Sequence, residues 1–120
     1  MADHNELGKL GEEIVHDHLI GLGHKILARN YSFNKAEIDI VTEFNNKLII
    51  TEVKTRQSDY LTDPDELVPI SKQKQIIKAA DQFIKENEID LDCQFDVYIV
   101  IVNKNKKEIR HIEDAFYPIL

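Results

Sequence analysis

Apolar residues recur every three or four positions near the start of the chain, which is the spacing of an amphipathic helix. The positions concerned are Leu7, Leu10, Ile14, Val15, Leu19 and Leu22. They predict a helix over residues 5–21, and Gly21 and Gly23 predict its end. A short strand is then expected over residues 25–29, before a polar turn over residues 30–35.

A pair of strands follows, with apolar and polar residues largely alternating. The strands are predicted over residues 36–44 and 47–55. They flank Asn45-Asn46, a dipeptide that tolerates positive φ and suits a two-residue hairpin loop. With that loop, Phe44 lies opposite Lys47, and this pair fixes the register of the whole hairpin.

The register brings charged side chains together. Asp39 is expected opposite Glu52, and Glu37 opposite Lys54, with Cβ atoms of opposed residues roughly 4.5–5.5 Å apart. Two carboxylates at that distance repel each other unless a proton or a cation intervenes. Mg²⁺ prefers one or two protein carboxylates together with water and phosphate oxygens. The hairpin therefore predicts a magnesium site, whereas a Glu-Lys pair on an exposed sheet face is the plain structural alternative.

The second half of the chain predicts another helix and two more strands. Residues 57–70 hold acids and prolines and predict a long loop, after which Ser71 is expected to cap a helix. This helix has an apolar stripe of Ile76, Ile77, Ala80, Phe83 and Ile84, and a polar side with Lys72, Lys74, Lys78 and Lys85. Residues 95–102 predict a central strand covered on both faces. Residues 108–112 predict the last strand, and Ala115-Phe116 a tail that docks on the core.

The predicted elements make one α/β or α+β domain, with a mixed sheet and helices packed against it. A chain of 120 residues is expected to form a single domain over residues 1–120. No apolar run approaches the roughly 20 residues that span a membrane, so no membrane partner is expected. The N-terminus lacks the basic and apolar regions of a signal peptide, and Cys93 is the single cysteine. Both observations favour the cytoplasm.

Net charge narrows the possible functions. A charge of −7 argues against a general nucleic-acid coat protein, which is normally basic. It does not exclude a nuclease, because a cation bound among clustered acids offsets their negative charge at the site.

A series of short motifs extends over nearly the whole chain. The motifs are Gly8-x-x-Gly11-Glu12, Arg29-Asn30-Tyr31, Glu37-Ile38-Asp39, Glu52-Val53-Lys54-Thr55-Arg56, Lys72 followed by Ala79-Ala80, Phe95-Asp96-Val97 and Ala115-Phe116. This series resembles the YraN family of small bacterial proteins, and the element order resembles the PD-(D/E)XK nuclease superfamily. The spacing of the acids and Lys54 is also similar to that of archaeal Holliday-junction resolvases. The resemblance implies a restriction-endonuclease-like αβββαβ core with a mixed central sheet flanked by helices.

The resemblance also implies roles for individual residues. Asp39, Glu52 and the backbone carbonyl of Val53 would hold Mg²⁺ or Mn²⁺, and Lys54 would orient or deprotonate the attacking water. Glu12 would act as a further ligand or lie close behind the metal, with an ordinary solvated helix residue as the alternative. These four side chains, from Glu12 to Lys54, are the expected catalytic groups.

Residues around this centre have lesser expected roles. Arg56 and Lys72 would contact nucleic acid, while Glu37 either holds Lys54 or simply adds to an acidic face. Ala36 departs from the family pattern, which usually has glycine there. The departure is a mild handicap if that position needs positive φ or close approach of a DNA backbone.

The leading expectation is a magnesium-dependent endonuclease-like hydrolase, or a nuclease-like protein, acting in DNA repair or recombination. DNA is favoured over RNA as the partner, and a homodimer would help such a small domain to grip a duplex. A non-catalytic nucleic-acid-binding or partner-docking module with the nuclease fold is the alternative. A third possibility is a purely structural domain whose acids form a solvated face.

Overall fold

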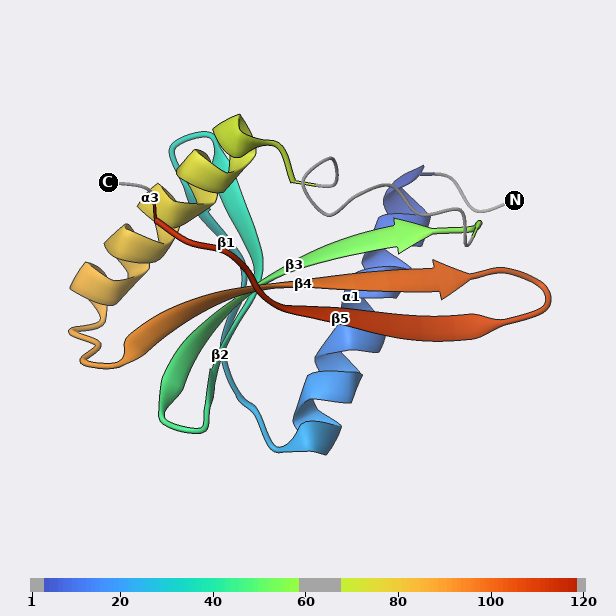
Figure 1. Ribbon diagram of the computed structural model, residues 1–120, viewed down its shortest axis with the longest axis horizontal. Helices are drawn as coiled ribbons and strands as arrows, with labels where there is room; N and C mark the ends of the chain where they lie inside the picture. Colours follow the sequence, from blue (N-terminus) through green and yellow to red (C-terminus); the bar gives the residue numbers. More distant parts are fainter. Residues whose placement is uncertain (1–3, 59–67, 119–120) are drawn as a thin grey trace.

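The computed structural model describes residues 4–58 and 68–118, which form a five-stranded mixed sheet with a helix on each face (Figure 1). The elements are α1 (His4–Leu22), β1 (Lys25–Phe33), β2 (Ala36–Phe44), β3 (Lys47–Arg56), α3 (Ile70–Glu86), β4 (Asp92–Val102) and β5 (Lys107–Phe116). Among the strands of the described ranges the order is β1-β2-β3-β4-β5, and only β3 and β4 pair in parallel. The predicted α+β fold with a flanked mixed sheet is confirmed.

Two apolar layers hold the helices on the sheet. On one face, α3 packs through Ile76, Ala80 and Phe83, and the predicted stripe is confirmed. On the other face, α1 packs through Val15 and Leu19. The middle of β4 is buried throughout, as expected of a strand covered on both sides. Neither helix in the described ranges is long and apolar enough to cross a membrane.

The hairpin register is as predicted over most of its length. Asn45 and Asn46 have φ values of 52° and 62°, and the ladder extends from Phe44↔Lys47 to Ile40↔Thr51. Beyond that pair β2 remains paired with β1, and β3 remains paired with β4. The expected ladder pairs of Asp39 with Glu52 and of Glu37 with Lys54 do not form. The sheet therefore opens between β2 and β3 at the position of the acids.

Several predicted boundaries are wrong. β1 continues to Phe33, so the turn is only Asn34-Lys35, and β5 continues to Phe116. Both are edge strands with exposed polar residues, which resemble turns in composition. Ser71 does not cap α3, because the helix begins at Ile70 and Pro69 occupies the cap position without a side-chain hydrogen bond. Most of the loop predicted over residues 57–70 lies outside the described residues.

Candidate active site

Asp39 and Glu52 form the centre of the site, at the point where β2 and β3 separate. Their exposures are only 9% and 6%. The backbone N–H of Val53 donates to Asp39 Oδ2 at 2.8 Å, which replaces a ladder hydrogen bond and explains why the strands part here. Burial, and then the Glu52 carboxylate, raise the pKa of Asp39 to about 8. The two acids therefore lie together, and their environment disfavours a second negative charge.

Two lysines approach this pair from different elements. Lys72 Nζ, at the start of α3, lies 3.3 Å from Glu52 Oε1, and Lys54 Nζ lies 4.0 Å from the same oxygen. Burial lowers the pKa of Lys54 and the adjacent Lys72 lowers it further, although Glu52 opposes both effects. For Lys72 the attraction of Glu52 outweighs burial and raises the pKa. Lys54 is thus the more easily deprotonated of the two.

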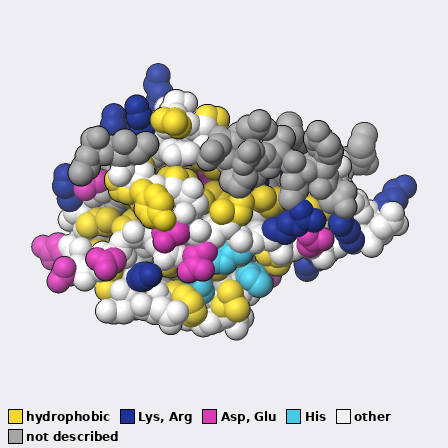
Figure 2. All heavy atoms as spheres, viewed as in Figure 1, with side chains coloured by type: hydrophobic (Ala, Val, Ile, Leu, Met, Phe, Trp, Pro, Cys, Tyr) yellow, Lys and Arg dark blue, Asp and Glu magenta, His cyan; other side chains and the backbone are white. Residues whose placement is uncertain are grey.

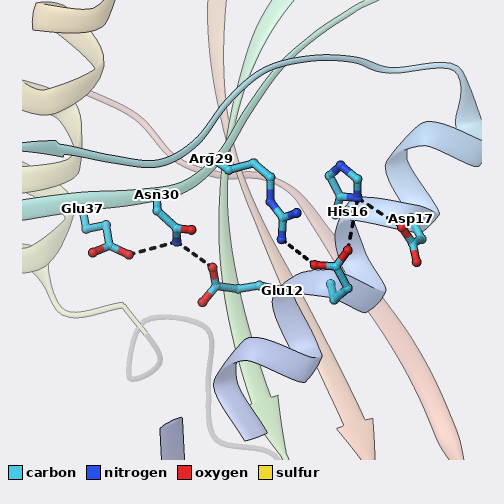
Figure 3. Close-up of polar contacts among 7 residues, drawn as sticks. Glu12, His16, Asp17, Arg29, Asn30 and Glu37 are labelled. Carbon is cyan, nitrogen blue, oxygen red and sulfur yellow. Dashed lines mark hydrogen bonds and ion pairs between the residues drawn. The ribbon is translucent and has the colours of Figure 1, made fainter. Parts of the chain in front are cut away.

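A second group of acids is held beside the first by an asparagine (Figure 3). Asn30 Nδ2 donates to Glu12 Oε1 at 2.8 Å and to Glu37 Oε1 at 3.1 Å, so one amide links α1 to β2. Burial raises the pKa of Glu12, and the negative charges of Asp39 and Glu37 raise it further. The hydrogen bond from Asn30 lowers the pKa but does not outweigh these effects. Glu37 therefore contacts Asn30, and the expected contact with Lys54 is not among its described hydrogen bonds or ion pairs.

The sequence neighbours of Asn30 and Glu12, Arg29 and Glu13, form a contact of their own. Arg29 Nη2 donates to Glu13 Oε2 at 2.9 Å, directly beside the Asn30–Glu12 bond (Figure 3). Glu13, His16 and Asp17 have ligand atoms within 4.8 Å of one another, but both acids are exposed. Arg29 already neutralises Glu13, so we interpret this group as a salt-bridged surface. Of the two neighbouring glutamates on α1, only Glu12 points toward the acids of β2.

Helix α1 reaches the sheet through a glycine. A Cβ on Gly11 would lie 1.8 Å from Thr55 Oγ1, whereas a Cβ on Gly8 would have nothing within 4 Å. Gly11 therefore lets the helix approach the sheet closely, whereas Gly8 has no such role. The contact seats α1 against β3 and places the next residue, Glu12, near the site.

Comparison with known proteins identifies the family. The model of the uncharacterised protein family UPF0102 matches residues 11–100. The chain belongs to UPF0102. A UPF0102 protein from Phocaeicola vulgatus is 42% identical over 118 residues, covering 98% of each chain. One from Christiangramia forsetii is 41% identical over 117 residues, again covering 98% of each, and one from Bacteroides thetaiotaomicron is 42% identical over 120 residues. The resemblance to the YraN family is thereby confirmed.

The donor atoms of this UPF0102 chain fit a hard divalent cation. Glu52 Oε2 is buried and finds no hydrogen-bond partner in the described part of the chain. An unpaired buried carboxylate oxygen is costly, and the lysines lie only against the other oxygen of Glu52. Carboxylate and carbonyl oxygens are the ligands that Mg²⁺ and Mn²⁺ prefer. Asp39, Glu52 and the Val53 carbonyl therefore suit such an ion, with Glu12 nearby.

A cleft of about 310 Å³ leads to the acids in this UPF0102 chain. Its lining residues are Lys35, Ala36, Glu37, Asp39, Glu52, Lys72, Gln75 and Ile76. Lys72 thus lies in the cleft as expected, whereas Arg56 is exposed and donates to the adjacent Thr55 carbonyl. Ala36 is part of the cleft wall but does not have positive φ. Of the two reasons for a glycine at this position, only the close approach of a DNA backbone therefore still applies.

Proposed function

We propose that this chain is a Mg²⁺- or Mn²⁺-dependent nuclease that hydrolyses phosphodiester bonds in DNA. Asp39 and Glu52 would hold the metal with the Val53 carbonyl, and Glu12 would complete or support the ligand set. One observation supports this most: a buried acid pair with an unpaired oxygen lies beside a lysine whose pKa is lowered. That combination costs stability in an inert domain and is typical of catalytic sites.

The residues have separable roles in this proposal. A bound divalent ion would supply positive charge for the developing phosphorane and lower the pKa of a water molecule. Lys54, with its lowered pKa, would orient that water and accept its proton. Lys72, on the exposed side of Glu52, would exchange its carboxylate partner for a substrate phosphate oxygen. Branched or single-stranded DNA in repair or recombination is the proposed substrate.

Cleavage assays on single-stranded, branched and duplex DNA, and on RNA, test the proposal in buffers with Mn²⁺ or EDTA. We expect metal-dependent cleavage that Asp39→Asn and Lys54→Met abolish while the melting temperature is kept. Glu12→Gln should reduce the rate, whereas Glu13→Gln, on the neighbouring helix position, should not. Wild-type protein that binds no metal and cuts none of these substrates would overturn the proposal.

A non-catalytic nucleic-acid-binding module remains the second candidate. The ion pair of Lys72 with Glu52 favours it, because this lysine partly neutralises the acids without a metal. This candidate predicts that Asp39→Ala leaves nucleic-acid affinity unchanged or improves it, since a repulsive carboxylate is removed. Cleavage by the wild type would exclude it.

A further inference from the structure

The cleft at the acids continues into a second hollow. This hollow, of about 540 Å³, is lined by Phe33, Asn34, Lys35, Ala36, Gln75 and Lys78. It shares Lys35, Ala36 and Gln75 with the acid cleft, so the two are continuous. Together they form a groove between the β1–β2 turn and the first half of α3, which lie side by side in Figure 1. We call this feature the α3 groove.

Lysines occur along the whole length of the α3 groove, and its acids lie at one end. Its lysines are Lys72, beside the acids, then Lys35 on the turn and Lys78 further along α3. Lys35 and Lys78 are exposed and form no ion pair with any residue in the described ranges. Figure 2 shows Lys and Arg side chains gathered at the upper left, around the β1–β2 turn and the start of α3. The second hollow has Lys35 and Lys78 and no acidic residue, whereas Glu37, Asp39 and Glu52 line the acid cleft, so it is the second hollow that favours an anionic ligand.

The remaining wall suits nucleotide bases. Gln75 and Asn34 are exposed amides that can donate and accept hydrogen bonds, and Phe33 supplies a half-buried aromatic ring. A lysine-lined groove with an aromatic side chain is the usual arrangement for single strands, because every base has a face that can stack. The acids lie 6% and 9% exposed at the end of this groove. A single strand reaches such buried acids more easily than a duplex does, because each strand of a duplex is flanked by the other strand.

We propose that the α3 groove binds a single-stranded DNA segment and directs its backbone toward Asp39 and Glu52. The directing role rests on the proposed function, but the binding needs no metal. Lys72, Lys35 and Lys78 would each contact a phosphate, and Phe33 would contact a base. With three phosphate contacts, the logarithm of affinity should fall with the logarithm of salt concentration with a slope of roughly −2.

Fluorescence anisotropy in EDTA tests this proposal, with a labelled oligothymidylate of about 12 nucleotides as the probe. We expect Lys35→Glu/Lys78→Glu to weaken binding at least roughly tenfold and to reduce the salt slope by about 1.4. The matched control is Lys104→Glu/Lys107→Glu, which changes charge equally at exposed positions of the β4–β5 turn and the start of β5. The control should stay within about twofold of wild type. If the charge-reversed variant does not fold, Lys35→Gln/Lys78→Gln replaces it.

The groove proposal is overturned if wild type binds no oligothymidylate, if both double variants lose affinity equally, or if a duplex of the same length binds more tightly. Its failure differs from failure of the nuclease proposal. If the protein binds single strands in EDTA but neither binds metal nor cleaves DNA, the groove proposal is supported and the nuclease proposal is overturned. If Lys35→Glu/Lys78→Glu cleaves DNA with metal as fast as the wild type does, the nuclease proposal is supported and the groove proposal is overturned.

Discussion

At the scale of single residues, Asn30 is the least expected part of the site. Its φ of 50° is one that asparagine and glycine tolerate, and its amide joins Glu12 to Glu37. Asn30→Gly should keep the backbone and lose the bridge. Residues that orient ligands typically affect metal affinity 10–100-fold, so we expect Mn²⁺ affinity to fall roughly tenfold with little change in melting temperature. Calorimetric titration measures the affinity.

A double-mutant cycle separates positioning from a general structural role. If Asn30 acts through Glu12, adding Asn30→Gly to Glu12→Gln should cost little further Mn²⁺ affinity. Additive losses in the cycle, or wild-type affinity in Asn30→Gly alone, would contradict a positioning role.

Residues of the site differ in how far the sequence could predict them. Asp39 and Glu52 were predictable neighbours, because a two-residue hairpin loop relates them through local geometry. Asn30 stands in the Arg29-Asn30-Tyr31 motif, but its role is not predictable because its two partners lie on different elements, 18 and 7 positions away. Its occurrence within a polar stretch suggested a turn, and positive φ inside a strand leaves no clear signal in one sequence.

At the scale of elements, the seating of α1 on β3 depends on one glycine. In Gly11→Ala the new Cβ would collide with Thr55 Oγ1, so the helix must shift outward. We expect a loss of roughly 1–3 kcal/mol in the free energy of unfolding, measured by urea denaturation. Gly8→Ala is the control and should stabilise by about 0.5–1 kcal/mol, since alanine favours helix and meets no atom. Adding Thr55→Ala to Gly11→Ala should recover part of the lost free energy of unfolding. If it recovers none, the collision with Thr55 is not the cause of the loss.

The pairing of β4 with β5 depends on a buried carboxylate. Asp96 is 2% exposed and accepts hydrogen bonds from His111 Nε2 at 2.7 Å, from Gln94 Nε2 and from the backbone N–H of Asp114. It holds β5 where the strand register shifts. Burial alone would raise the pKa of Asp96, but these hydrogen bonds outweigh it and lower the pKa. Removing the charge should therefore weaken this edge of the sheet.

The lowered pKa of Asp96 fixes the direction of the pH effect. Its stabilisation is present above the ordinary pKa of about 4 and is lost as pH falls through the lower pKa of the folded state. In Asp96→Asn, the free energy of unfolding should fall at neutral pH, and the difference from wild type should shrink in acid. Denaturation curves from about pH 3 to pH 7 measure this. A constant difference across that range would contradict it.

At the scale of the whole molecule, local patterns predicted the layers but not the opening between β2 and β3. The helices and the central strand follow from periodicity, and the hairpin from its asparagines. The opening arises because β2 remains paired with β1 while β3 remains paired with β4, and Asp39 takes the N–H of Val53. These contacts join segments that are distant in sequence. Because local patterns do not contain them, local patterns predict a continuous ladder. The opening creates the cleft, and it makes the acid pair reachable by a ligand.

Metal binding should be linked to protons through this cleft. The pKa of Asp39 is about 8, so near neutral pH a proton occupies the carboxylate that the cation needs. Mn²⁺ affinity should therefore rise with pH up to about 8, by at most about tenfold per unit, and binding should release a proton. Titration calorimetry at several pH values, in buffers of different ionisation enthalpy, measures both effects. Glu13→Gln should behave as wild type, and Asp39→Asn should bind weakly at every pH. Affinity that is independent of pH would mean that Asp39 is not the group displaced by the metal.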